Sequence, residues 1–331
     1  PGVVEGAEEG PPQRPPSAQG GPLSAWVEPG TTVYANPICS QLDQLILQCE
    51  DLESVLVLLV THRGVFFVHN LVTAIQMLAS IAGEADDHLA VNELLRDPRY
   101  DLLIRDLTRF VPKLDFLAMT NVACGLWQLD HKHYLLFSRM LRPVLKQPAP
   151  DVGSLLRCVQ AYAWAGYHTQ HQFYEHFARV LAGMMPELSP DKLVEACVLF
   201  GGAAHYQGQF FRKAEQALLG QGVMEDRLRP REVVLVARAF TAHLRTSHDA
   251  LLECAAGIVE REAAGMELAD VARCLVAFRR VALRFEGAVR AGAAVFEPPL
   301  RRAWLLRRHV EGARAADVAA VIECAAYFGV R

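Results

Sequence analysis

The amino-acid sequence lacks the signatures of several large protein classes. Its longest uninterrupted apolar run, Val55–Val60, falls far short of the roughly 20 residues that a membrane-spanning helix needs. None of its eight cysteines forms a CxxC pair, which argues against a zinc ribbon and against a secreted disulfide framework. Collagen-like and wholly disordered chains are excluded because 52% of the 331 residues are hydrophobic and only 21% are charged. The chain can therefore build a large core, with its cysteines as buried free thiols.

Motifs for catalysis are also missing. The chain has no GxSxG, no glycine-rich phosphate loop and no HExxH. The polar run 130–133 falls in a predicted turn between helices, and the HxxH pair His168 and His171 lacks the neighbouring cysteines of a ligand set. We therefore expect no enzyme activity, no cofactor and no metal. A hydrolase or kinase would need a deep pocket that gathers titratable groups distant in sequence.

Helical periodicity dominates the chain from Leu42 onward. The stretches 40–60, 69–83 and 151–166 all place apolar residues at three- and four-residue steps. Alternation with a period of two never lasts more than a few residues, so no strand is predicted. By contrast, the first 37 residues are rich in Pro, Gly, Ala and Glu and show no helical period. The sequence predicts an all-α domain over residues 41–331, preceded by an extended low-complexity arm over residues 1–40 that lies on a partner surface.

Self-similarity within the chain indicates tandem repeats of about 37–40 residues. Prolines at predicted helix starts recur at Pro112, Pro150, Pro190 and Pro230. Histidines recur at a step of 37 at His131, His168 and His205, where they either cap helix ends or offer stacking to a ligand. A pair of helices of this length cannot bury its apolar face alone and must stack on copies of itself. We therefore predict an α-solenoid of about six helix hairpins. The expected pairs span 42–80, 98–147, 151–186, 190–221, 230–264 and 267–296, with an acidic insertion at 81–97 and a further first helix at 315–328.

The charge of the chain is unevenly distributed. Residues 1–226 carry 16 Lys and Arg against 25 Asp and Glu, whereas residues 227–331 carry 17 against 12. Every cation of the second segment is arginine, which suits planar, bidentate contacts to phosphate. A solvated basic face or an acidic protein partner would explain the same bias. The acidic first segment indicates a surface that faces other proteins.

The basic side chains give the candidate RNA-binding residues. Four of them fall in the first helices of successive repeats, where a solenoid presents one face, and the others cluster near the C-terminus. The predicted set is Arg157, Lys192, Arg238, Arg273, Arg279, Arg280, Arg301, Arg302, Arg307 and Arg308. Binding by such a face would depend on salt and little on base sequence. Aromatic residues late in these helices are expected to pack in the core, with base stacking as the alternative reading.

The stretch Leu94–Leu145 resembles a known family. Its helix entry Asp97–Tyr100, together with Asn121 and the recurring Trp127 and Trp164, is similar to the helical region of FAST-kinase-domain and RAP-domain proteins. The following units resemble the heptatricopeptide or octotricopeptide-like repeats of organellar RNA-binding proteins, and the resemblance covers about residues 60–280. It implies binding, processing or scaffolding of organellar RNA and no kinase activity. The chain departs from the family pattern because no RAP domain follows its repeats.

Together these observations predict a non-enzymatic, RNA-binding helical-repeat protein of organellar gene expression. The expected setting is a divergent mitochondrial ribosome, with a plastid as the alternative location. Its partners would be ribosomal or messenger RNA and neighbouring protein subunits, the latter reached through the N-terminal arm. The alternative is a protein–protein scaffold of the HEAT or armadillo type that has no contact with RNA.

Overall fold

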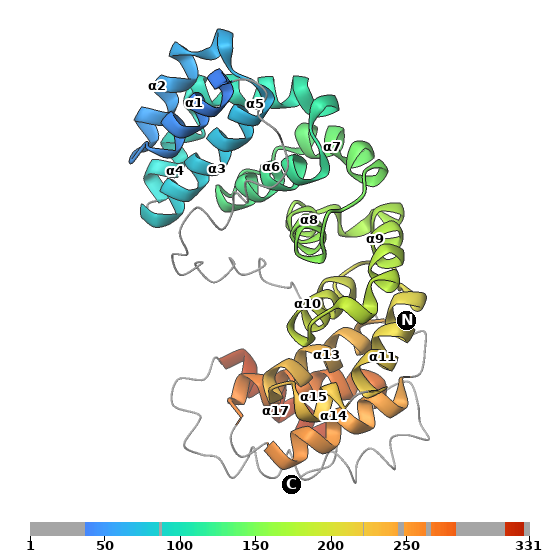
Figure 1. Cartoon of the computed structure of the whole chain (residues 1–331). Coiled ribbons are helices and arrows are strands. Elements are labelled where there is room, and N and C mark those ends of the chain that lie inside the picture. The colour runs from blue at the N-terminus through green and yellow to red at the C-terminus, as the bar shows by residue number, and fades with distance from the viewer. Residues whose placement is uncertain are drawn as a thin grey trace, which may run out of the picture. The chain divides into compact units, whose positions relative to one another are not determined.

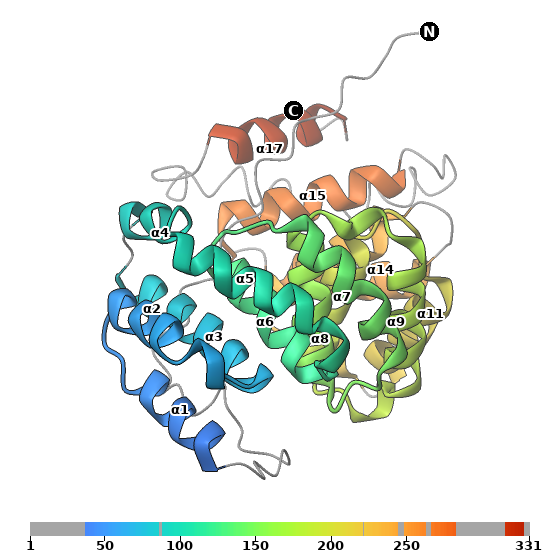
Figure 2. The ribbon, with the colours of Figure 1, turned by 90° about the horizontal axis from the view of Figure 1, so that it is seen from above.

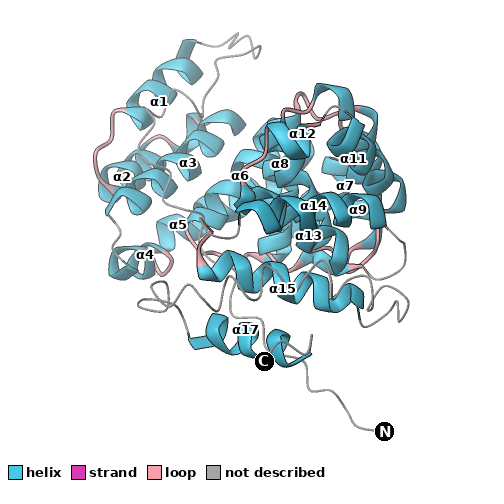
Figure 3. Ribbon diagram, turned by 90° about the horizontal axis from the view of Figure 1, so that it is seen from below, coloured by secondary structure: helices cyan, strands magenta, loops and turns pink. Residues whose placement is uncertain are grey.

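The computed structural model describes residues 37–85, 88–220, 222–243, 248–262, 266–282 and 315–327. Throughout these ranges the regular elements are helices and none is a strand (Figure 3), which confirms the all-α prediction. Successive helices pack against their neighbours in chain order, as in a solenoid of repeats. Residues 1–36 of the predicted arm lie outside the described ranges. The first helix begins at Pro37, slightly earlier than the predicted start of the helical domain.

The chain forms two compact units that meet in sequence between Pro150 and Asp151. Unit 1 contains α1 (Pro37–Leu47), α2 (Leu52–Thr61), α3 (Val68–Ala85), α4 (His88–Leu94), α5 (Pro98–Phe110), α6 (Phe116–Gln128) and α7 (Tyr134–Lys146). The central helix α3 packs between α1 and α6 (Figure 1), and α5 packs between α2 and α7. Unit 1 thus has a first row, α1–α3–α6, and a second row, α2–α5–α7.

Unit 2 repeats this arrangement. It contains α8 (Val152–Trp164), α9 (His171–Gly183), α10 (Pro190–Gly201), α11 (Gly208–Gly220), the short α12 (Val223–Asp226), α13 (Pro230–Ala242), α14 (Asp249–Glu262), α15 (Leu268–Ala282) and α17 (Ala315–Tyr327). Its first row is α8–α10–α13–α15–α17, and its second row is α9–α11–α14. In Figure 2, α17 lies alongside α15, which packs against α13.

The predicted helix pairs of unit 1 are wrong in their boundaries. The ranges 42–80 and 98–147 were expected to hold one pair each, but three pairs occupy this part of the chain: α1 with α2, α3 with α5, and α6 with α7. The apolar periodicity of residues 40–60 continues across a break, where Asp51 accepts a hydrogen bond from the Ser54 amide (2.7 Å) and begins α2. The expected insertion at 81–97 is mostly helical, because α3 runs to Ala85 and α4 begins at His88.

Local chemistry explains the starts of three helices in unit 2, α8, α10 and α13. Pro190 and Pro230 are the first residues of α10 and α13, as the repeat predicted. Pro150 instead precedes Asp151, whose carboxylate accepts a hydrogen bond from the Ser154 amide (2.8 Å) and caps α8. Pro112 lies in the 3₁₀ turn Val111–Lys113, ahead of α6. Proline therefore marks these two helix starts from the preceding turn and not from the first helical position.

Glycine permits the closest contacts between first-row helices. Gly201 at the end of α10 faces Ala239 of α13, and a Cβ added at Gly201 would lie 2.7 Å from the Ala239 Cα. In unit 1, Gly125 of α6 faces the Ile75 carbonyl of α3, and an added Cβ would lie 3.3 Å from that oxygen. The backbones of neighbouring repeats therefore approach closely in both units.

The buried core follows the predicted pattern. Phe200, Phe240 and Phe278 are buried at the same position of successive helices, which confirms core packing for these aromatics, whereas Trp127 and Trp164 are only half-buried. All eight cysteines are free thiols, and seven of them are buried. Burial raises the pKa of Cys197 and Cys274 far above the ordinary value of a thiol.

Candidate nucleic-acid interface

A solvent-facing stripe runs across the first row of unit 2. When residues are counted from the first residue of α8, α10, α13 and α15, positions 5, 7, 8 and 11 are buried in all four helices, and positions 2, 6, 9 and 13 are buried in none. The spacing is that of one helix face. Because these helices pack side by side in chain order, equivalent positions form rows. The unit 2 stripe consists of Gly153, Arg157, Gln160, Trp164, Asp191, Glu195, Val198, Gly202, Arg231, Leu235, Arg238, Ala242, Ala269, Arg273, Val276 and Arg280.

Four predicted residues lie on this stripe. Arg157 and Arg273 occupy position 6, Arg238 occupies position 9, and Arg280 occupies position 13. Lys192 and Arg279 flank the stripe at positions 3 and 12. The remaining predicted residues, Arg301, Arg302, Arg307 and Arg308, lie outside the described residues. The fold thus brings the described candidates onto one face of unit 2.

Three of the predicted cations are not free, contrary to the picture of an open basic face. Lys192 Nζ lies 2.7 Å from Glu195 Oε2, Arg273 Nη1 lies 2.8 Å from Asp270 Oδ1, and Arg279 Nη1 lies 2.9 Å from Glu323 Oε2 on α17. The first two pairs join residues three apart on one helix. Solvent screens the Lys192 and Arg279 pairs, in which both side chains are partly exposed, so each contributes about 1 kcal/mol or less. Asp270, by contrast, is buried. A phosphate can replace Glu195 or Glu323 at small cost, whereas withdrawal of Arg273 would leave the buried Asp270 without its cation.

Arg157 is oriented by a chain of hydrogen bonds at the start of α8. Its Nη2 donates to Ser154 Oγ (3.3 Å), and Ser154 Oγ donates to the Asp151 carboxylate (2.5 Å). Burial raises the pKa of Asp151, but the bonds from Ser154 and the charge of Arg157 outweigh it and leave that pKa below its usual value. The carboxylate therefore stays charged at neutral pH and holds the guanidinium in place.

Three cations of the stripe are exposed, two of them on α13 and the third, Arg280, on α15. Arg231 and Arg238 are exposed, and neither forms an ion pair with any residue that the structure describes. Arg231 was missed by the sequence prediction, although counting from the helix-starting Pro230 places it on the same face as Arg238. Gln160 and Trp164 on α8 add a hydrogen-bonding group and a half-buried aromatic ring to the stripe.

The predicted histidine row does not cap helices. The His131 ring is hydrogen-bonded to the Tyr100 hydroxyl (2.8 Å) in unit 1. In unit 2, the exposed His205 packs its ring edge against His171 at 4.8 Å between centroids. The His168 carbonyl accepts a hydrogen bond from the Ala204 amide (3.0 Å), which ties neighbouring repeats together through their turns.

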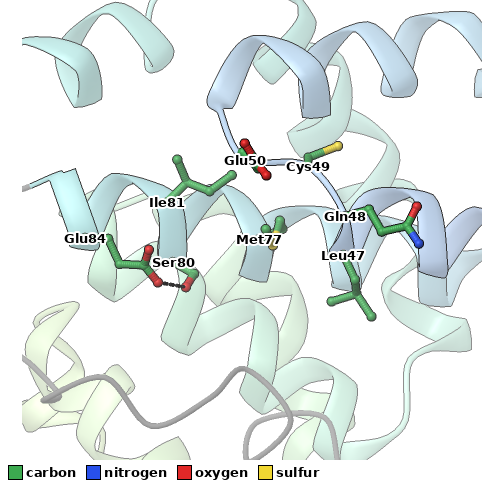
Figure 4. Close-up of a pocket in the computed structure, with 8 residues that line it drawn as sticks. All are labelled: Leu47, Gln48, Cys49, Glu50, Met77, Ser80, Ile81 and Glu84. Atoms are coloured by element: carbon green, nitrogen blue, oxygen red, sulfur yellow. Dashed lines mark hydrogen bonds between the residues drawn. The ribbon is translucent and has the colours of Figure 1, made fainter.

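A cavity in unit 1 offers no catalytic arrangement. It has a volume of about 520 Å³ and lies where α1 ends against the last turns of α3 (Figure 4). Three of its polar groups bond to neighbours within the chain, since Ser80 Oγ donates to Glu84 Oε1 (3.4 Å) and Cys49 Sγ donates to the Leu45 carbonyl (3.4 Å). Burial raises the pKa of Cys49, so the thiol stays protonated, and no histidine is among the lining residues to act as its base.

Comparison with known proteins adds no family. No protein-family model matches the chain, and a search of the curated proteins finds no match to it. Within the described ranges, no group of three or more His, Cys, Asp or Glu side chains could hold a metal ion. Among the helices of that same part of the chain, none is both long and apolar enough to cross a membrane.

Proposed function

We propose that the chain is a non-enzymatic RNA-binding helical-repeat protein of organellar gene expression, and that its RNA contacts lie on the unit 2 stripe. The observation that carries this proposal is the register of Arg157, Arg238, Arg273 and Arg280 on one face of helices that pack in a row. Guanidinium groups bind phosphate oxygens in pairs and stack on bases. A row of such groups on α8, α13 and α15 suits an extended phosphate backbone, although α10 contributes the acids Asp191 and Glu195 to the stripe.

The wider setting follows from the resemblance to FAST-kinase-domain and RAP-domain proteins. On that basis we place the protein in the mitochondrion, as a subunit of a divergent ribosome that contacts ribosomal RNA and neighbouring proteins. A plastid is the alternative location. Fractionation of the source cells, followed by sedimentation of the native protein with and without ribonuclease, tests this setting. An organellar ribosomal particle that carries the protein would support it, and a location outside both organelles would refute it.

A protein–protein scaffold is the second candidate. It is favoured by the ion pairs of Lys192, Arg273 and Arg279, because cations that already bind carboxylates of their own chain are less available to phosphate. In this case the stripe would contact a protein and bind no RNA.

The two exposed arginines of α13 separate these candidates. We expect the double variant R231E/R238E to bind a fluorescently labelled single-stranded oligouridylate more weakly than the wild type. The slope of log affinity against log salt should become shallower by about 1.4, since each lost phosphate contact removes about 0.7. The matched control is R212E, because Arg212 is exposed on the second-row helix α11 and lies off the stripe.

Fluorescence anisotropy at several salt concentrations measures both quantities. A variant with the affinity and salt slope of the wild type would refute RNA binding by the stripe. If the wild type binds no RNA at low salt, the scaffold is favoured instead. Both positions are exposed and outside the core, so we expect each variant to keep its helices. Far-UV circular dichroism checks this.

A further inference from the structure

Unit 1 carries a second concentration of positive charge, on the other row of helices. Its members are exposed cations of α5, of the following 3₁₀ turn and of α7, at helical steps of three or four residues. The α5–α7 basic face consists of Arg105, Arg109, Lys113, Arg139, Arg142 and Lys146. The negative charge of residues 1–226 as a whole conceals this face.

The two helices hold their cations side by side. Arg139 Nη1 of α7 donates to the Thr108 carbonyl of α5 (3.5 Å), and Gln147 Nε2 donates to the Leu114 carbonyl (3.0 Å). The two contacts join residues 31 and 33 positions apart, and the residue numbers increase together along both segments. The helices therefore run parallel, with their C-terminal halves side by side. Their core faces, which include Leu107 on α5, are buried. The exposed faces of both helices, with their cations, therefore form one continuous surface.

No carboxylate of the described residues forms an ion pair with this face, although the exposed Asp101 lies one turn before Arg105 on α5. Asp106, the acid of α5 nearest in sequence, accepts hydrogen bonds from Arg63 Nε (2.9 Å) and Nη2 (3.1 Å). Asp97 caps α5 and binds Arg99 (2.7 Å). None of the six cations forms an ion pair within the part of the chain that the structure describes. This differs from the unit 2 stripe and its flanks, where Lys192, Arg273 and Arg279 are ion-paired.

Helix dipoles explain only part of the arrangement. Arg109 and Lys146 lie in the last turns of their helices, where cations stabilise the carbonyl ends. Arg105, Arg139 and Arg142 lie further from the ends, where the dipole effect is weak. Cations gathered on one face repel one another, so a bound anion would relieve a cost that the free protein carries.

We propose that the α5–α7 basic face binds the phosphate backbone of RNA, as a contact separate from the unit 2 stripe. The six cations lie from the middle of the helices onward and in the following turn, whereas the exposed apolar residues of α7, Tyr134 and Leu135, lie in its first turn. Charged residues are depleted at the centre of a protein interface, and lysine in particular is. The half-buried ring of Phe110 lies beside the cations of α5. Arg109 Cζ is 5.6 Å and Lys113 Nζ is 5.3 Å from the centroid of this ring. The identification of the bound polyanion as RNA rests on the proposed function. The cluster of positive charge is observed independently of that function.

Neutralisation of three arginines tests this site in the full chain. We expect R105Q/R109Q/R142Q to bind single-stranded oligouridylate with a salt slope shallower by about 2, because three phosphate contacts at about 0.7 each are lost. The matched control R179Q/R212Q/R227Q removes three exposed arginines elsewhere and should keep the slope of the wild type. Thermal stability of R105Q/R109Q/R142Q should change little, because the mutual repulsion that is removed is offset by the lost helix-end and ring contacts of Arg109.

The outcomes distinguish this site from the stripe. If R105Q/R109Q/R142Q keeps the wild-type slope while R231E/R238E loses affinity, the α5–α7 proposal is wrong and the proposed function stands. If R105Q/R109Q/R142Q loses affinity while R231E/R238E does not, the α5–α7 face is the RNA contact and the stripe is not. If poly-L-glutamate displaces RNA from the wild type at equal charge concentration, the face selects acidic polypeptides as readily as RNA, which overturns the RNA assignment.

Discussion

Gly201 lies at a close contact between the first-row helices α10 and α13, and replacing it by alanine should destabilise the protein. A Cβ at this position would lie 2.7 Å from the Ala239 Cα, 2.8 Å from its Cβ and 3.1 Å from its carbonyl oxygen. Two of these three atoms belong to the backbone of α13, so no side-chain rotation relieves the clash. The helices must move apart or shift along one another.

The expected magnitude follows from two opposing effects. Insertion of a methyl group into a packed contact costs about 1–3 kcal/mol. Alanine is favoured over glycine within a helix by up to about 1 kcal/mol, but Gly201 is the last residue of α10 and gains less. We therefore expect G201A to lower the free energy of unfolding by about 2 kcal/mol. For a unit of this size that corresponds to a fall in Tm of about 4–8 °C.

Urea and thermal unfolding, followed by far-UV circular dichroism, measure this change. The matched control is G183A, because Gly183 is also the last residue of its helix, α9, and an added Cβ would meet no atom within 4 Å. The control should be as stable as the wild type or slightly more stable. Equal stability of G201A and G183A would refute the close helix contact and, with it, the register that aligns the unit 2 stripe.

Part of the fold could be predicted because its causes are local. Apolar residues at three- and four-residue steps establish the helices, and Pro190 and Pro230 mark two helix starts because proline fits the first turn. The break between α1 and α2 was missed because apolar periodicity continues through it. What ends α1 and begins α2 is the capping bond of Asp51 together with packing on α3. Whether a cap interrupts an apolar helical pattern therefore depends on packing against residues that are distant in sequence.

The candidate site likewise has contacts that the sequence could predict and contacts that it could not. The Lys192–Glu195 pair could have been predicted, since residues three apart on a helix face one another. The pair between Arg279 and Glu323 joins residues 44 apart and becomes visible only in the folded chain. The α5–α7 basic face had a signal in the four-residue steps of its cations. That signal was lost because charge was summed over residues 1–226, where acidic segments outweigh it.

Two further perturbations test unit 1. Replacing the fully buried Asn70 by alanine removes its hydrogen bonds to Asp43 Oδ1 (2.6 Å) and the Cys39 carbonyl (2.9 Å), so N70A should destabilise the protein by about 3 kcal/mol in urea unfolding. The double variant D43A/N70A should lose less than the sum of the single variants, and strict additivity would contradict the coupling. The second perturbation concerns pH. Burial lowers the pKa of His131, the neighbouring His133 lowers it further and Asp101 opposes them, so below about pH 6.5 the unfolded chain binds more protons than the folded chain. This contribution to stability is complete above the unfolded pKa and is lost as the pH falls through the lower folded pKa. In H131N, which retains an acceptor for the Tyr100 hydroxyl, stability should therefore fall less steeply between pH 7 and pH 5, as measured by urea unfolding across that range. An unchanged pH slope would show that His131 titrates equally in both states.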